Sequence, residues 1–140
     1  MHTNRFRTWL FAVVAALALS ACQTTPPTDI SAPAVDPACT VSQAAFNHIH
    51  ARHCTPGVPA NQLLPVYCQN AASAQTFCRM VQDAPNKIRV VQPDGRIRYD
   101  SNLNQVVGTA GEKCGRMVME PNGDVVTEFP ETGNAPPPCM

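Results

Sequence analysis

Three of the chain's four histidines and one arginine fall within the stretch FNHIHARHC, residues 46–54. A histidine titrates near neutral pH, so one imidazole can accept a proton while another donates one. An arginine beside them offers a planar fork of N–H groups that suits a phosphate. An acid–base pair of His48 and His53, with Arg52 as a phosphate-binding residue, is therefore one interpretation of this stretch.

Two other interpretations stay open. If the stretch is a helix, His50 and His53 share one face, and His48 and Arg52 share another. A histidine pair three positions apart can bind a metal ion. However, no histidine follows residue 53 and no carboxylate stands at a recognisable spacing, so we expect no metal and no other cofactor. The last interpretation is a solvated helix end, where the helix dipole favours positive charge.

The catalytic interpretation carries a geometric condition. His48 and His53 lie five positions apart, which places their side chains about 140° apart on a regular helix. For both rings to act on one substrate, we expect the helix to loosen near Arg52.

Two helices are expected before any strand. The first covers about residues 41–52, because Thr40 and Gln43 form a capping-box pattern and apolar residues follow at helical spacing. The stretch 55–68 contains three prolines and a glycine and is expected to be a loop. The second helix lies within 70–84, with Asn70 as its cap and with Phe77 and Val81 in helical register.

The apolar period then changes from helical to alternating. The segments 87–92 and 96–100 flank the turn sequence PDG, and the segments 115–120 and 124–129 flank PNGD. Both patterns predict hairpins. The segment NQVVGT, residues 104–109, is a further candidate strand. We therefore expect an α+β domain with two N-terminal helices packed on one face of a four- to five-stranded antiparallel sheet.

Two features of these strands could serve chemistry. Lys87 and Arg89 share one strand face, as do Arg96 and Arg98 on theirs, which suggests a cationic strip for an RNA backbone or an acidic partner. The alternative is an exposed strand whose charges prevent edge pairing.

In GDVVTEFP, alternation places Val125, Thr127 and Phe129 on one face. Thr127 could bond a phosphoryl oxygen, or the segment could be an ordinary core strand.

The N-terminus predicts export. Two arginines precede an apolar run that is too short to span a membrane. The sequence LSAC, residues 19–22, resembles the bacterial lipobox, which implies a signal peptide over 1–21 and a lipid on Cys22 that anchors the protein in a membrane. Gln23 then favours the outer membrane, facing the periplasm. An ordinary secretory signal cut near Ala21 is the alternative.

Six cysteines remain after Cys22, an even number that suits three disulfides in an oxidising compartment. They are Cys39, Cys54, Cys68, Cys78, Cys114 and Cys139. Their spacing lacks the close pairs of zinc sites. Their connectivity stays open, with one exclusion: if Cys39 and Cys54 bracket the first expected helix, they lie about 20 Å apart and cannot bond.

The composition divides the exported chain into three parts. Residues 22–38 are a lipidated cysteine and a flexible Pro/Thr-rich tether, residues 39–130 are one small domain stapled by disulfides, and residues 131–140 are an irregular tail held by Cys139. After residue 21 the chain has eight Lys and Arg against ten Asp and Glu. That balance excludes a globally basic nucleic-acid binder.

Taken together, two motifs resemble the C-terminal ribonuclease domains of bacterial polymorphic and contact-dependent-inhibition toxins. These domains often open with F-x-H-I-x-x-R-H, here Phe46 to His53, and close with I/V-x-T-x-Y/F-P, here ending in Phe129-Pro130. The sequences PDGRIRY and VVGTAG between them are similar to EndoU-like nucleases of the barnase–EndoU–colicin–RelE fold group. Ribonuclease-A-like toxin domains show a related arrangement.

The resemblance implies metal-independent RNA cleavage. His48 and His53 would be the acid–base pair, Thr127 would donate a hydrogen bond to the phosphoryl group, and Arg52 or Arg98 would be the cation. His50 lies outside the pattern, and Cys54 replaces a glycine that is common in the family.

The rival hypothesis is a non-catalytic lipoprotein that binds an envelope protein, as an inhibitor, an immunity protein or an assembly factor. The two hypotheses differ in whether His48, His53 and Thr127 converge, and in whether the Cys54 disulfide crosses the mouth of their cleft.

Overall fold

A computed structural model describes residues 35–132 and residue 139. The expected signal peptide, Cys22, most of the tether and most of the tail lie outside these residues. The elements follow one another as α1 (Gln43–His53), the 3₁₀ turn η1 (Pro65–Tyr67), α2 (Ala71–Asp83), β1 (Ile88–Val91), β2 (Ile97–Asn102), β3 (Cys114–Met119) and β4 (Val125–Glu131).

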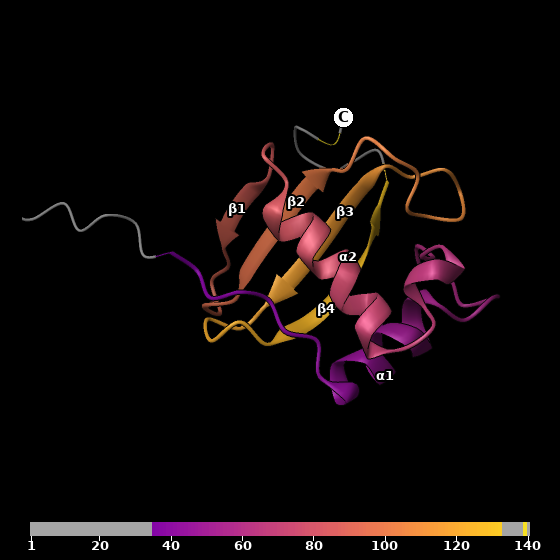
Figure 1. Cartoon of the computed structure of the whole chain (residues 1–140), viewed down its shortest axis with the longest axis horizontal. Helices are drawn as coiled ribbons and strands as arrows, with labels where there is room; N and C mark the ends of the chain where they lie inside the picture. Colours follow the sequence, from indigo (N-terminus) through magenta and orange to yellow (C-terminus); the bar gives the residue numbers. More distant parts are fainter. Residues whose placement is uncertain (1–34, 133–138, 140) are drawn as a thin grey trace, which may run out of the picture. The chain divides into compact units, whose positions relative to one another are not determined.

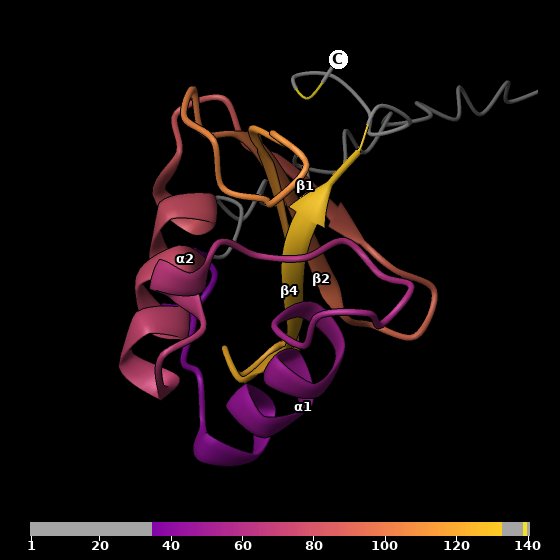
Figure 2. The same cartoon turned by 90° about the vertical axis from the view of Figure 1, so that its right-hand side faces the viewer.

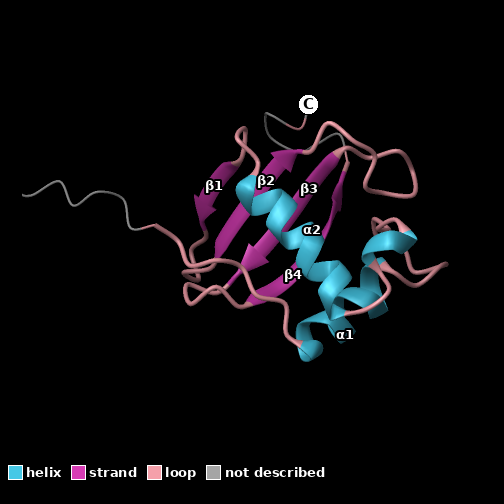
Figure 3. Cartoon of the chain, viewed as in Figure 1, coloured by secondary structure: helices cyan, strands magenta, loops and turns pink. Residues whose placement is uncertain are grey.

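The four strands form one antiparallel sheet in the order β1-β2-β3-β4. Figure 1 shows α2 lying across one face of this sheet, and Figure 3 shows the same layers coloured by type of structure. Figure 2 shows α1 beside β4, rather than stacked with α2 over the sheet. The expected α+β class is confirmed. Helix α1 contacts mainly the edge strand β4, and its Phe46 and Ile49 join the same core as α2.

The start of α1 differs from the prediction. Its N-cap is Ser42, whose hydroxyl accepts from the Ala45 N–H. Thr40, the expected cap, instead forms a bridge with Asp124 beside the β3–β4 turn. The buried face of the helix consists of Phe46, Ile49 and His53. The Ser42 hydroxyl, two positions after Thr40, thus caps the helix in place of the expected Thr40–Gln43 capping box.

The start of α2 agrees with the prediction. The Asn70 side chain accepts from the Ser73 N–H, and the Ser73 hydroxyl accepts from the Asn70 N–H, which makes a reciprocal capping box. Phe77 and Val81 are fully buried. They press on Gly115 of β3, where an added Cβ would lie 2.6 Å from Val81 and 2.9 Å from Phe77. Only glycine lets the helix approach the sheet this closely.

Both predicted hairpins are present. The β1–β2 and β3–β4 turns contain Gly95 and Gly123, each in the left-handed region with φ of 87° and 97°. The segment 104–109 is not a strand, which corrects that expectation. Its backbone pairs with the loop 62–64 instead, for example through the Leu64 N–H and the Val107 carbonyl at 2.9 Å.

The two faces of the sheet differ in character. Residues paired directly across antiparallel strands point to the same face. The inner face, toward α2, carries rows such as Tyr99–Met117–Glu128, and these side chains are buried. The outer face carries two rows of largely half-buried side chains, Arg98–Val118–Thr127 and Asp100–Arg116–Phe129.

A β-bulge in β4 changes the expected alternation. Val118 pairs with Thr127 and Met119 pairs with Val125, so Val126 is the extra residue. Val125 therefore packs in the core, whereas Thr127 and Phe129 stay outside the core cluster. The prediction that Val125, Thr127 and Phe129 share one face is wrong for Val125.

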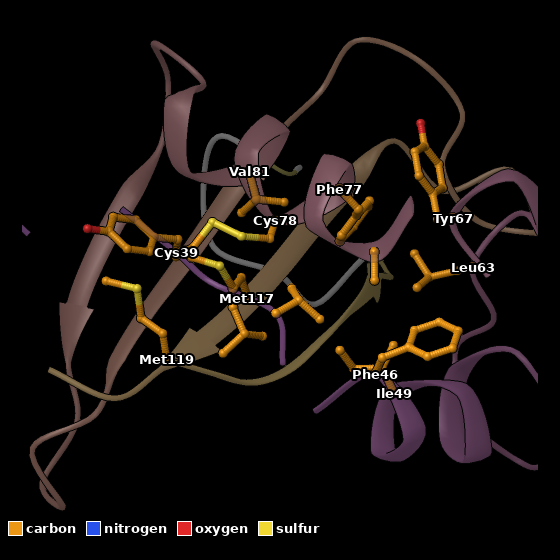
Figure 4. Packing of buried hydrophobic residues seen from close by; sticks show 14 of the residues in the cluster. Cys39, Phe46, Ile49, Leu63, Tyr67, Phe77, Cys78, Val81, Met117 and Met119 are labelled. Atoms are coloured by element: carbon orange, nitrogen blue, oxygen red, sulfur yellow. A yellow bond between two sulfur atoms is a disulfide. The ribbon is translucent and has the colours of Figure 1, made fainter. Parts of the chain in front are cut away.

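The core lies between the sheet and the helices (Figure 4) and contains Ile49, Phe77, Val81, Met117 and Met119. Three disulfides tie it together: Cys39–Cys78, Cys54–Cys68 and Cys114–Cys139. All six predicted cysteines take part, and Cys39 and Cys54 are not paired with each other, as expected.

Residues 36–38, at the end of the expected tether, contact the domain, for example through the Gln82 amide, which donates to the Pro37 carbonyl at 2.9 Å. The Asp36 carboxylate accepts from the guanidinium of Arg89 and from the Tyr99 hydroxyl. The Arg89 guanidinium beside Asp36 holds the pKa of that carboxyl below its usual range.

Within the described range, no helix has the length and apolar character needed to cross a membrane.

A candidate active site at the end of the first helix

Three segments that are distant in the sequence line an open pocket of about 380 Å³. Helix α1 contributes His48, Arg52 and His53, the following loop contributes Ala60 and Asn61, and strand β4 contributes Thr127 and Phe129. The three residues expected to be catalytic therefore line one cavity. Because α1 packs directly beside β4, the last turn of the helix and the middle of the strand bound the same space.

His53 is the anchor of this pocket. It is the last residue of α1 and is 6% exposed. Its Nδ1 lies 2.9 Å from the carbonyl oxygen of Asn61. A carbonyl can only accept, so Nδ1 carries the proton in this bond and Nε2 is the nitrogen left to accept one. In this tautomer, Nε2 is the ring nitrogen with the lone pair that a general base uses.

The environment of His53 also favours its neutral form. Burial lowers the pKa of His53, and the positive charges of Arg52 and His48 lower it further, while the hydrogen bond to Asn61 acts in the opposite direction. An imidazole in this setting is unprotonated at neutral pH and can take a proton from a substrate.

The loop 54–68 holds the Asn61 carbonyl in place. The Leu63 N–H donates to the His53 carbonyl at 2.7 Å, and the Gln62 amide donates to the Arg52 carbonyl at 2.9 Å. The Cys54–Cys68 disulfide closes the loop at its base. Sequence reasoning missed Asn61, because it acts through a backbone carbonyl that every residue type possesses.

Phe129 and Thr127 form the strand side of the pocket. The Phe129 ring stacks on the His53 ring, with centroids 4.8 Å apart and an interplanar angle of 17°. Both residues are half-buried on the outer face. The Thr127 hydroxyl makes no hydrogen bond within the described residues, so it is available to a ligand. Phe129, expected to be either a core or a face residue, is a wall of the pocket.

His48 and Arg52 form the solvent side. Both are exposed, and neither side chain has a hydrogen-bond partner in the described part of the chain. The helix stays regular through His53, so the expectation that it loosens near Arg52 is wrong. His48, Arg52 and His53 nevertheless line the same pocket. His50 lies outside it and makes an edge contact with Phe46 at 5.7 Å between ring centroids.

The four cations of the β1–β2 hairpin do not line the pocket. Arg89 shares the inner face with Tyr99, whereas Arg98 lies on the outer face opposite Val90. The expected single cationic strip is therefore divided between two faces of the sheet. Each of these arginines also contacts a carboxylate: Arg89 contacts Asp36, Arg96 contacts Glu120, and Arg98 contacts Asp100.

Cys54 does not close the pocket. It lines a separate, largely apolar cavity of about 540 Å³ with Pro56, Leu63 and Cys68. Across residues 35–132 and 139, no group of three or more His, Cys, Asp or Glu side chains is placed to hold a metal ion.

Comparisons with protein-family models, with curated proteins and with solved structures found no match to this chain.

Proposed function

We propose that this protein is an envelope lipoprotein whose pocket beside α1 cleaves RNA without a metal ion. The observation that carries the proposal is the hydrogen bond from His53 Nδ1 to the Asn61 carbonyl, which leaves Nε2 as the proton acceptor in a pocket shared with His48 and Thr127. Two histidines, one buried and one exposed, match the two proton transfers of phosphodiester transfer.

In the proposed reaction, His53 Nε2 removes the proton from a ribose 2′-hydroxyl, and the 2′-oxygen attacks the adjacent phosphorus. His48, in its protonated form, gives a proton to the departing 5′-oxygen. The products are a 2′,3′-cyclic phosphate and a free 5′-hydroxyl. The nucleophile in this step is the 2′-oxygen of the RNA itself. The step therefore needs neither a water molecule nor a metal ion.

The crowded phosphorane carries extra negative charge, which needs donors aimed at its oxygens. Arg52 supplies a guanidinium on the solvent side, and the Thr127 hydroxyl supplies a neutral donor on the strand side. Donors on opposite sides of the pocket would hold the phosphate between the two histidines.

A second candidate is the non-catalytic binding module, and the apolar cavity beside the Cys54–Cys68 disulfide favours it. A cavity of about 540 Å³ lies within the usual size range of ligand pockets. In that case the histidine pocket would be an inherited feature without activity, and an envelope protein would be the partner.

The test compares the wild type with His48→Ala and His53→Ala, as full-length oxidised protein in detergent with EDTA present. The matched control is His50→Ala, because His50 is on the same helix and outside the pocket. We expect each pocket variant to lose cleavage by about 100-fold or more, while His50→Ala cleaves like the wild type. Equal activity in all four proteins would reject the proposal.

A further inference from the structure

We propose that Arg98 binds the phosphate of a nucleotide next to the one that is cleaved, and that a chain of ion pairs holds it ready for this task. The inference rests on the proposed function, because it extends the substrate from one phosphodiester to an oligonucleotide. The ligand class is a single-stranded RNA longer than a dinucleotide.

Four side chains of alternating charge run across β4, β3 and β2, and we name them the charge ladder: Glu131, Arg116, Asp100 and Arg98. Arg116 donates to Glu131 through Nη1 at 2.5 Å and to Asp100 Oδ1 through Nε at 2.6 Å. Arg98 donates to Asp100 Oδ2 through Nε at 2.9 Å. Asp100 is fully buried, and each of its two carboxylate oxygens accepts from one arginine.

Arg98, at one end of the charge ladder, has N–H donors that bind no other group of the described residues. Arg116 contacts two carboxylates, whereas Arg98 contacts one and uses only its Nε. The two Nη groups of Arg98 have no partner within the part of the chain that the structure describes. Its side chain is 26% exposed, which is enough to meet a ligand. A guanidinium fixed at Nε and free at Nη is preorganised for a phosphate.

The outer face joins Arg98 to the pocket. Arg98, Val118 and Thr127 form one cross-strand row, so the Cα atoms of Arg98 and Thr127 lie two strand spacings apart, about 10 Å. In the next row, the Arg116 guanidinium lies over the Phe129 ring at 5.9 Å, and that ring stacks on His53. A strand of RNA cleaved at His53 can therefore continue over Val118 to Arg98.

The other hairpin arginines lack this combination. Arg89 lies on the inner face and donates to Asp36 through both Nε and Nη2. Arg96 lies at the turn and contacts the half-exposed carboxylates of Glu120 and Asp94. Neither has a fully buried carboxylate beneath it, and neither stands in a row with Thr127. Arg98 is thus the hairpin cation best placed for a second phosphate.

The first test is cleavage of two substrates by the full-length oxidised protein. A dinucleoside monophosphate has a single phosphate, which the histidine pocket occupies, so Arg98→Gln should lose less activity on it than on a longer RNA. On a hexaribonucleotide we expect Arg98→Gln to lose about tenfold in kcat/KM, as one lost phosphate contact of about 1.4 kcal/mol requires. Arg79→Gln is the charge-matched control, because Arg79 is exposed on α2, away from the outer face.

The second test is binding of a fluorescent 2′-deoxy hexanucleotide, which cannot be cleaved. Arg98→Gln should bind about tenfold more weakly than Arg79→Gln and should lower the salt slope of log K by about 0.7. Arg98→Lys keeps the charge but cannot both hold Asp100 and present a free fork, so it should retain the salt slope and still bind more weakly.

The outcomes separate the two proposals. If the wild type cleaves neither substrate but Arg98→Gln still weakens binding, the proposed activity fails and the phosphate site stands. If Arg98→Gln behaves like Arg79→Gln in binding and in hexanucleotide cleavage, or loses activity equally on both substrates, Arg98 is no second phosphate site. Full binding by Arg98→Lys would overturn the role of the charge ladder.

Discussion

The carbonyl oxygen of Asn61 lies 2.9 Å from Nδ1 of His53, and this single contact fixes which ring nitrogen is free. The two residues belong to different elements, the end of α1 and the loop that follows it. The loop therefore determines the tautomer of a histidine on the helix. Substitutions in the loop, at His53 and at the residues around the ring can each test this arrangement.

Activity should persist into mild acid. Because burial lowers the pKa of His53 below 6.5, the base stays unprotonated to a lower pH than a free histidine would. The acid limb of kcat/KM, which reports the base in the free enzyme, should lie below pH 6.5. Phe129→Ala uncovers the ring and should move this limb upward. A limb above pH 6.5 in the wild type would contradict the assignment of His53 as the base.

The Cys54–Cys68 disulfide should matter for activity as well as stability. Its replacement by two serines should cost about 3 kcal/mol of unfolding free energy and should also lower cleavage, because the loop that presents the Asn61 carbonyl is no longer closed. Cys114–Cys139 is the matched control. Its removal should cost a similar free energy, measured by urea unfolding, but leave the cleavage rate of the folded protein unchanged. Equal losses of activity in both variants would argue against a role for the loop.

Thr127→Val tests the phosphoryl donor. Valine has nearly the shape of threonine and suits a strand, so the fold should be kept while the hydroxyl is lost. We expect kcat to fall on the order of 100-fold with little change in KM, as for loss of a transition-state donor. Thr76→Val on α2 is the control, since the Thr76 hydroxyl donates to the Ala72 carbonyl far from the pocket. An unchanged kcat in Thr127→Val would remove Thr127 from the reaction.

Glu128 should make the protein less stable as the pH rises. Both of its carboxylate oxygens lack a partner among the described residues, and burial raises the pKa of Glu128 well above 4.5. The folded carboxyl thus keeps its proton at a pH where the unfolded one has lost it, so the unfolding free energy falls from about pH 4.5 upward. In Glu128→Gln this fall should be smaller, as measured by urea unfolding at pH 4.5 and pH 7.5. Asp83→Asn, at an exposed position on α2, should follow the wild type; if Glu128→Gln does so too, the burial effect is absent.

Local signals predicted much of the fold. The cap at Asn70, the helical register of Phe77 and Val81, and the two glycine turns each depend on a few neighbouring residues, and the structure contains all of them. The segment 104–109 has strand-like residues, but its backbone pairs with the loop 62–64, more than 40 residues earlier in the sequence. No local pattern reveals such a partner.

The candidate site was also predicted only in part, because some of its contacts join residues that are distant in the sequence. Residue types placed His48, His53 and Thr127 on the list of candidates, and the packing of α1 beside β4 then brought them to one pocket. The Asn61 carbonyl and the Arg116–Asp100 pair required the folded chain, because one acts through the backbone and the other depends on strand register. The bulge at Val126, which places Val125 and Thr127 on different faces, lies in the pairing of β4 with β3, and the alternation of β4 alone does not reveal it.

The most direct test of the central claim is the cleavage product of the wild-type protein in EDTA. The substrate is a short RNA, compared with the same sequence carrying a single 2′-deoxy residue at the cleavage position. Attack by the 2′-oxygen predicts a 2′,3′-cyclic phosphate end from the RNA, detected by mass spectrometry, and no cleavage at the deoxy position. Cleavage of the deoxy position, or activity that disappears with the chelator, would contradict metal-independent catalysis by His48 and His53.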